Sequence, residues 1–278
     1  MSLSVNTNIS AIEAYNNLNA TNSAMQTSIN QLSSGLKIQN ASQGAADYVI
    51  SQGLQTQANG LGVAINNGQD AISVLQIATG AMNQQISILQ TMNQLATQAA
   101  NAGANNTTSS NADQQEFAAL QAQLDQIANS TQFGSSTQLL NGTYTGQSFQ
   151  IGAYASSVDQ VVVSIGNLGS ASLGVSAASV NISTASAAFS AMASVQAAIG
   201  TVASAEAAVG ATQNQIQDII ANDTVAQQNV TSANSTLVDT NMAKAMTNFS
   251  SQQVLMQAGV AMLSQAQALP QLILKLLP

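Results

Sequence analysis

The fold is decided between residues 61 and 89, which have the sequence LGVAINNGQDAISVLQIATGAMNQQISIL. Apolar or small residues recur there with alternating spacings of four and three, at Leu61, Ile65, Gly68, Ile72, Leu75, Thr79, Met82, Ile86 and Leu89. This heptad pattern predicts a helix whose apolar seam packs along another helix. We expect one helix over residues 45–100, about 80 Å long at ~1.5 Å per residue.

A second heptad stretch begins at Phe189 and supplies the partner. Its seam residues are Val195, Ile199, Val202, Val209, Ile216 and Ile220. The sequence therefore predicts a mainly α fold, with long antiparallel heptad helices that form a coiled-coil-like rod. Glu206 interrupts this seam. It is either a polar residue that sets the register, a position at the helix edge, or a switch for assembly or pH.

The middle of the chain has a different pattern. We expect a polar loop at 101–111 and a short helix at 113–129. Short β-prone stretches follow at 138–141, 148–152 and 158–165, which predict two or three strands in hairpins. Residues 166–186 are rich in Ser, Ala and Gly, and we interpret them as a low-complexity segment that tolerates insertions.

Both ends of the chain predict helical arms with too little else in the sequence to cover their apolar faces. We expect breaks at 40–44 and 239–241 and a last helix that stops before Pro270. The most economical fold pairs the arms with each other, but we expect them to be loose in the free subunit and to order when they dock on other copies, which couples folding to assembly. The predicted self-assembly residues are Leu18, Met25, Ile29, Leu32, Val254, Met256, Val260 and Leu263.

These patterns predict five segments. Residues 1–44 form the N-terminal arm, and residues 45–130 form the N-terminal rod helices. Residues 131–188 hold the β-hairpin and the variable segment. The C-terminal rod helix covers residues 189–238, and the C-terminal arm covers residues 239–278.

Composition excludes several classes of function. The chain has no His, no Cys and a net charge of −8, so the usual general bases, thiolates and metal ligands are missing. Its three lysines form no basic patch for nucleic acid or membrane binding. We expect no catalytic residue, cofactor, metal site, signal peptide or membrane insertion. The alternative of a carbohydrate-active or lytic enzyme would use Asp113, Glu116 and Asp125.

Several short motifs occur in one order along the chain: Asn6-Thr-Asn8, Leu32-Ser-Ser-Gly-Leu36, Ser148-Phe-Gln-Ile-Gly-Ala153, Gln257-Ala-Gly259 and Ala268-Leu-Pro-Gln271. Together they resemble bacterial flagellin over about the first 175 and last 80 residues. The resemblance implies an extracellular filament subunit for motility, whose arms line an inner tube. It also implies export through the flagellar channel without a cleaved signal, and as partners an export chaperone, junction proteins and a filament cap.

The resemblance leaves alternatives. A hook–filament junction protein shares the terminal pattern, and a membrane-active helical translocator would use residues 243–278. Residues 89–98 match a flagellin stretch bound by an innate-immune receptor. There Thr91, Asn93 and Gln94 stand where the family has Arg, Arg and Glu, so we do not expect strong binding. Two hypotheses address the low charge content: an acidic habitat, or glycans on residues 170–190.

Overall fold

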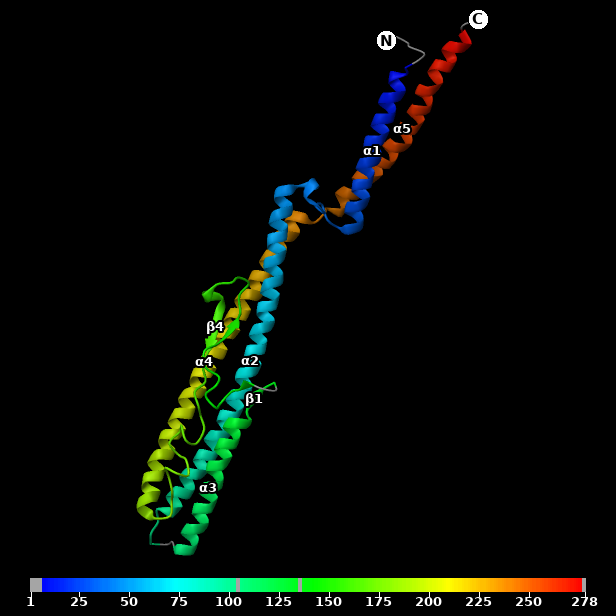
Figure 1. Cartoon of the computed structure of the whole chain (residues 1–278). Helices are drawn as coiled ribbons and strands as arrows, with labels where there is room; N and C mark the ends of the chain where they lie inside the picture. The colour runs from blue at the N-terminus through cyan, green and yellow to red at the C-terminus, as the bar shows by residue number, and fades with distance from the viewer. Residues whose placement is uncertain (1–6, 104–105, 135–136, 277–278) are drawn as a thin grey trace. The chain divides into compact units, whose positions relative to one another are not determined.

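The computed structural model describes residues 7–103, 106–134 and 137–276, with the side chains of all of these except 107 and 269–276. Helices dominate this part of the chain (Figure 1). They are α1 (Ile9–Ser34), α2 (Ala45–Ala99), α3 (Thr107–Ser130), α4 (Ala185–Val238) and α5 (Met242–Leu276), with two short 3-10 turns, η1 (Ala41–Gln43) and η2 (Ser157–Asp159). The mainly α fold that the heptads predict is confirmed.

The chain divides into two compact units. Unit 1 comprises residues 1–56 and 229–278, and unit 2 comprises residues 57–228. Unit 1 thus contains the two predicted arms together with the first turns of α2 and the last turns of α4.

In unit 2, α2 and α4 pack side by side and antiparallel. The side-chain amide of Gln227 donates to the carbonyl of Ala58 at 3.1 Å. Further along, a Cβ on Gly68 would stand 2.8 Å from the Ile220 side chain. Residue numbers therefore rise on one helix as they fall on the other. A larger residue at position 68 would require the Ile220 side chain to move, so glycine suits this close packing.

The predicted seam residues lie in or against the core of unit 2. Leu75, Met82, Leu89, Val195, Val202, Val209 and Ile216 belong to its buried cluster, and Ile72, Ile86, Ile199 and Ile220 pack against that cluster. Ile65 is half-buried. Glu206 is half-buried beside Ala205, which also packs against the cluster.

Some of the most buried positions along α2 hold small residues, beside larger ones such as Leu75 and Met82. Ala71 and Ala78 are fully buried, whereas their larger neighbour Ile72 is only partly so. A methyl side chain lets two helix backbones approach closely, and the longer aliphatic residues then fill the flanks. Isoleucine is more hydrophobic than alanine, so the heptad pattern predicts Ile72 and not Ala71 as a seam residue.

The predicted loop at 101–111 is wrong in its second half, because α3 begins at Thr107. Asn106 is the N-cap: its side chain accepts a hydrogen bond from the Ser109 amide at 2.9 Å, and the Ser109 hydroxyl bonds the Asn106 amide. This reciprocal capping box satisfies amides of the first turn. A stretch of Asn, Thr and Ser that resembles a loop in composition is therefore a helix start.

Four short strands form two hairpins. β1 (Gln132–Phe133) pairs with β2 (Thr137–Gln138), and β3 (Gln147–Gln150) pairs with β4 (Gln160–Val163), both antiparallel. Val161 and Val163 face the core while the alternate residues of β4 are exposed. The side-chain amide of Asn67 on α2 donates to the carbonyl of Gln150 at 3.0 Å, which fastens the second hairpin to the helix.

Residues 166–184 make up most of the segment 166–186 that we predicted to be of low complexity and tolerant of insertions, and they pack into the core of unit 2. Leu168, Leu173, Val175, Val180 and Ile182 are all buried. The helices hold this segment through side-chain hydrogen bonds. Gln85 donates to the Leu168 carbonyl, Gln121 to the Val175 and Val180 carbonyls, and Gln114 accepts from the Ile182 amide.

Among the described helices, α4 contains an 18-residue window with a mean hydropathy of 1.3. By length and composition alone, this helix could cross a membrane. One such helix is weak evidence, because a core helix of a soluble protein passes the same test. The apolar seam of α4 is buried in the core of unit 2, while 28% of the window as a whole is buried.

Candidate assembly surface

Within unit 1, α1 and α5 lie side by side and antiparallel (Figure 1). On α5 the residues that lose exposure follow a strict heptad spacing: Ala245, Phe249, Gln252, Met256, Gly259, Leu263 and Ala266. On α1 the matching series is Ala11, Ala14, Leu18, Thr21, Met25, Ser28 and Leu32. This arm seam joins the two ends of the chain, as the sequence analysis expected.

Close contacts fix the register of the arm seam. The Ser28 hydroxyl, which is almost fully buried, donates to Oε1 of Gln252 at 2.8 Å. A Cβ on Gly259 would stand 3.2 Å from Cδ1 of Leu18, so glycine allows the helices to come together at that level. Gly259 is the glycine of the Gln257-Ala-Gly259 motif.

The predicted end of the last helix before Pro270 is wrong, because α5 continues to Leu276. Proline has no amide hydrogen, so the carbonyl of Ala266, four residues earlier, lacks its helical donor. The side-chain amide of Asn8 donates to that carbonyl at 2.7 Å. The Asn8 carboxamide oxygen also caps α1 by accepting from the Ala11 amide at 3.1 Å. The Asn8 side chain thus both replaces the donor that Pro270 lacks and caps the first turn of α1.

The two breaks between the arms and the long helices pair with each other. Gly35 ends α1 in the left-handed conformation with φ of 73°, which favours glycine. The Lys37 amide then donates to the Val238 carbonyl at 2.6 Å, and the Thr240 amide to the Gly35 carbonyl at 2.8 Å. The Leu32-Ser-Ser-Gly-Leu36 motif therefore forms a helix stop followed by a short antiparallel bridge between Leu36 and Asp239.

The eight predicted self-assembly residues fall into two groups. Leu18, Met25, Leu32, Met256 and Leu263 are half-buried in the arm seam. Ile29, Val254 and Val260 are 37%, 64% and 52% exposed. The structure therefore assigns the first group a partner within the same chain and leaves the second group on the surface.

More apolar residues are exposed on the arms than the sequence analysis selected. They are Ile9, Ile12 and Tyr15 on α1, and Met242, Met246, Leu255 and Met262 on α5. On α5 they stand on both flanks of the arm seam as well as opposite to it. A helix with apolar residues around its whole circumference is normally buried on all sides. That property was readable from the sequence, because few charged residues interrupt residues 242–276.

A groove of about 400 Å³ runs along one flank of the arm seam. Its α1 wall is polar, with Glu13, Asn17 and Thr21, and its α5 wall is apolar, with Leu255 and Met262. Glu13 is the only carboxylate on α1. The groove thus combines one polar and one apolar wall, as expected for contact with an amphipathic surface.

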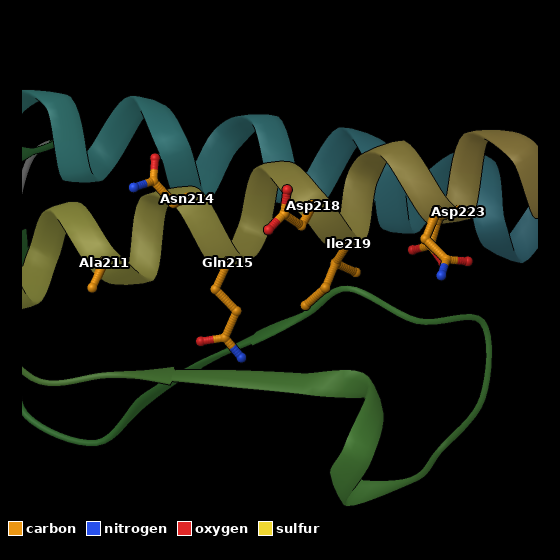
Figure 2. A pocket seen from close by; sticks show the side chains of 7 residues that line it. Ala211, Asn214, Gln215, Asp218, Ile219 and Asp223 are labelled. Carbon is orange, nitrogen blue, oxygen red and sulfur yellow. The ribbon is translucent and has the colours of Figure 1, made fainter.

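A second groove lies along α4 in unit 2, with Asp218, Ile219 and Asp223 among its lining residues. In Figure 2 the side chains of Gln215 and Ile219 point from α4 toward the hairpin. Burial raises the pKa of the Asp223 carboxyl, and the nearby Asp159 carboxylate raises it further. Within the described residues no group of three or more acidic side chains could hold a metal ion.

Of the three carboxylates weighed for an enzyme, Asp125 has a structural role. Asp125 accepts from the amide of Ser170 at 2.7 Å and from its hydroxyl at 2.8 Å, so it holds the 166–184 segment. Glu116 is exposed, and Asp113 is largely buried. Ser170 is also largely buried, which removes it from the residues considered for glycans.

Two family models match the chain. Residues 5–145 match the bacterial flagellin N-terminal helical region, and residues 192–277 match the bacterial flagellin C-terminal helical region. The flagellin of Bacillus subtilis is 36% identical over 98% of this chain and 99% of its own length.

Longer relatives and a solved structure are also similar. Polar flagellin B/D of Vibrio parahaemolyticus is 49% identical over 55% of this chain but only 40% of its own length. The crystal structure of Bacillus cereus flagellin has a TM-score of 0.49 and 25% identity, over 57% of this chain and 88% of that one. The two family matches and the near full-length match to a flagellin do not favour a junction protein. The chain belongs to the bacterial flagellin family, the structural subunits of the extracellular flagellar filament.

Proposed function

We propose that this flagellin polymerises through the outer faces of α1 and α5, and that several neighbouring copies together cover α5. The observation that carries this proposal is the distribution of apolar residues on α5. Its contact with α1 covers one side, while Met246, Val254, Val260 and Met262 remain about half or more exposed. A helix that exposes apolar residues on several faces is expected to be covered by other copies.

Charge supports the same proposal. The three lysines of the chain and three of its carboxylates, those of Glu13, Asp47 and Asp239, fall in unit 1, which is therefore neutral. Burying a helix between neighbours is costly when it carries unpaired charges. Between Met242 and Ala268, α5 carries a single charge, that of Lys244. Close packing of many arms therefore removes few charges from water.

The test compares a double substitution on α5 with a single substitution on α1. The double variant Val254→Asp/Val260→Asp places charges on its exposed faces, so we expect loss of filaments with little change in monomer helicity. Leu18→Ala, in the arm seam, is expected to lower the free energy of unfolding of the monomer. The loss should be below the ~2–5 kcal/mol of a fully buried Leu→Ala change, because Leu18 is only half-buried. Sedimentation and negative-stain microscopy measure polymerisation, and circular dichroism measures helicity.

Val158→Asp in η2 is the matched control, because Val158 is 86% exposed but lies outside the arms. This variant should polymerise nearly as well as the wild type. Normal filaments from the double variant at Val254 and Val260 would contradict the proposal.

The exposed apolar residues of α5 would need to be covered by another protein before assembly. We propose an export chaperone that shields α5, and junction and cap proteins that contact the arms at the ends of the filament. Export would use the flagellar channel without a cleaved signal. We expect no catalytic activity and no strong binding by the innate-immune receptor, since Thr91, Asn93 and Gln94 replace charged residues of the family.

A further inference from the structure

Methionine is the readiest target for oxidation in this sequence, which has nine methionines and neither cysteine nor tryptophan. A hydroperoxide transfers one oxygen atom to the thioether sulfur, giving methionine sulfoxide and an alcohol, or water when the oxidant is hydrogen peroxide. The product is polar where the thioether was apolar, and reductases can reverse the reaction.

Burial sorts the described methionines into three classes. Met82 and Met92 are fully buried in the core of unit 2. Met25, Met192 and Met256 are half-buried. The exposed class lies entirely on α5: Met242 is 48% exposed, Met246 is 53% exposed and Met262 is 65% exposed. Oxidant in solvent therefore reaches sulfur atoms on the C-terminal arm before those of the core.

The exposed methionines occupy positions where a polar oxygen would matter. Met246 follows the seam residue Ala245, and Met262 precedes the seam residue Leu263, so the two flank the arm seam on opposite sides. Met262 also lines the groove between α1 and α5, across from Glu13. A sulfoxide on either flank puts a polar group into apolar surface that would have to be buried between copies.

We propose that Met242, Met246 and Met262 form an oxidation site that controls polymerisation. Hydroperoxides convert them to sulfoxides in the free subunit, which blocks docking of α5 and leaves the core of unit 2 folded. Reduction of the sulfoxides restores docking. This inference rests on the proposed role of α5 in polymerisation.

The experiment treats the full-length monomer with hydrogen peroxide, removes the oxidant, and measures the concentration of protein left unpolymerised. Peptide mass spectrometry locates each added oxygen. We expect oxidation of the three exposed residues first and a rise in the unpolymerised concentration of about tenfold or more. Treatment with methionine sulfoxide reductases and dithiothreitol should reverse the rise, because the dithiol supplies two electrons, is oxidised to a disulfide, and the sulfoxide oxygen leaves as water.

Two variants make the result specific. Met242→Leu/Met246→Leu/Met262→Leu keeps apolar side chains of similar volume, and it should polymerise equally well with and without peroxide. Met192→Leu is the matched control on α4 and should stay as sensitive as the wild type.

Each contrary result has a distinct meaning. Wild-type protein that carries the three sulfoxides yet polymerises normally would overturn this inference and leave the proposed function intact. A triple Leu variant that peroxide still inhibits would also overturn it. If the proposed function fails, the double variant at Val254 and Val260 forms normal filaments without any oxidant.

Discussion

At the residue scale, Asn8 connects the two ends of the chain through one side chain. Its carboxamide oxygen caps α1, and its amide group bonds the Ala266 carbonyl that Pro270 leaves without a helical donor. Two motifs of the family resemblance, Asn6-Thr-Asn8 and Ala268-Leu-Pro-Gln271, are thereby joined by a single physical mechanism. Their separation of 258 residues between Asn8 and Ala266 hides this relation in the sequence.

We predict that Asn8→Ala weakens the pairing of α1 with α5 by about 2–3 kcal/mol. Loss of the cap accounts for ~1 kcal/mol, and the unpaired Ala266 carbonyl accounts for ~1–2 kcal/mol. Hydrogen exchange of α1 amides in the monomer measures the effect. Asn8→Asp keeps the cap but removes the donor, so it should show only the second part.

A double-mutant cycle tests the link to Pro270. Pro270→Ala returns an amide hydrogen to the helix, which can bond the Ala266 carbonyl. In the Pro270→Ala background, Asn8→Ala should weaken the pairing of α1 with α5 only by the ~1 kcal/mol of the lost cap. Equal costs in both backgrounds would show that Asn8 does not compensate for the proline.

At the element scale, the β3–β4 hairpin brings Asp159 close to Asp223 on α4. The other carboxylate lining this groove is that of Asp218, and residues 57–228 contain no lysine, arginine or histidine to offset them. Burial, and then Asp159, raise the pKa of the Asp223 carboxyl above its ordinary 3.8. The folded state therefore binds this proton more tightly than the unfolded chain does.

We predict that this pair makes unit 2 more stable in mild acid. Ionised Asp223 lowers the free energy of unfolding at every pH above the pKa of Asp223 in the folded state. This loss is relieved as the pH falls through that pKa toward 3.8. Asp223→Asn should raise stability at pH 7 and reduce the gain on acidification. Urea unfolding at pH 7 and pH 4 measures both effects.

Asp218→Asn, an exposed carboxylate on the same helix, is the control and should change little. Equal pH dependence in wild type and Asp223→Asn would exclude the pair as its source. The predicted gain in the stability of unit 2 on acidification agrees with the acidic-habitat hypothesis. Assembly of filaments between pH 2 and pH 8 tests that hypothesis directly.

At the scale of the whole molecule, charge is divided unevenly between the units. Unit 2 carries eight carboxylates and no cationic side chain, so the entire net charge of −8 resides there. The carboxylates are Asp70, Asp113, Glu116, Asp125, Asp159, Glu206, Asp218 and Asp223. In the proposed assembly, packing many copies into a filament would bring these like charges together, while the neutral arms would supply apolar contact.

We predict that added sodium chloride lowers the concentration of unpolymerised subunit. Salt at 0.1 M screens charges over about 10 Å, which weakens repulsion between units 2 of neighbouring copies. The variant Asp70→Asn/Glu116→Gln/Asp218→Asn removes three exposed carboxylates and should show a shallower salt dependence. If the variant keeps the wild-type slope, salt acts through apolar contacts and not through screening.

The sequence by itself determined the helical plan of this protein. Heptad spacing predicted α2 and α4, their antiparallel pairing and the seam of Leu75, Met82, Val202 and Ile216, because a 3.5-residue repeat has one efficient way to be buried. The helical arms followed from apolar chain ends with few charges. The division into five segments and the eight assembly residues remain predictions.

Tertiary structure alone decided the rest. Residues 166–184 have no local pattern, yet Gln85, Gln121 and Asp125 on distant helices supply the hydrogen bonds that hold them. In the same way, Asn8 allows α5 to continue through a proline that local rules treat as a stop. A pattern along the chain reports which face is apolar, but the partner of a polar group far away in sequence exists only once the chain has folded.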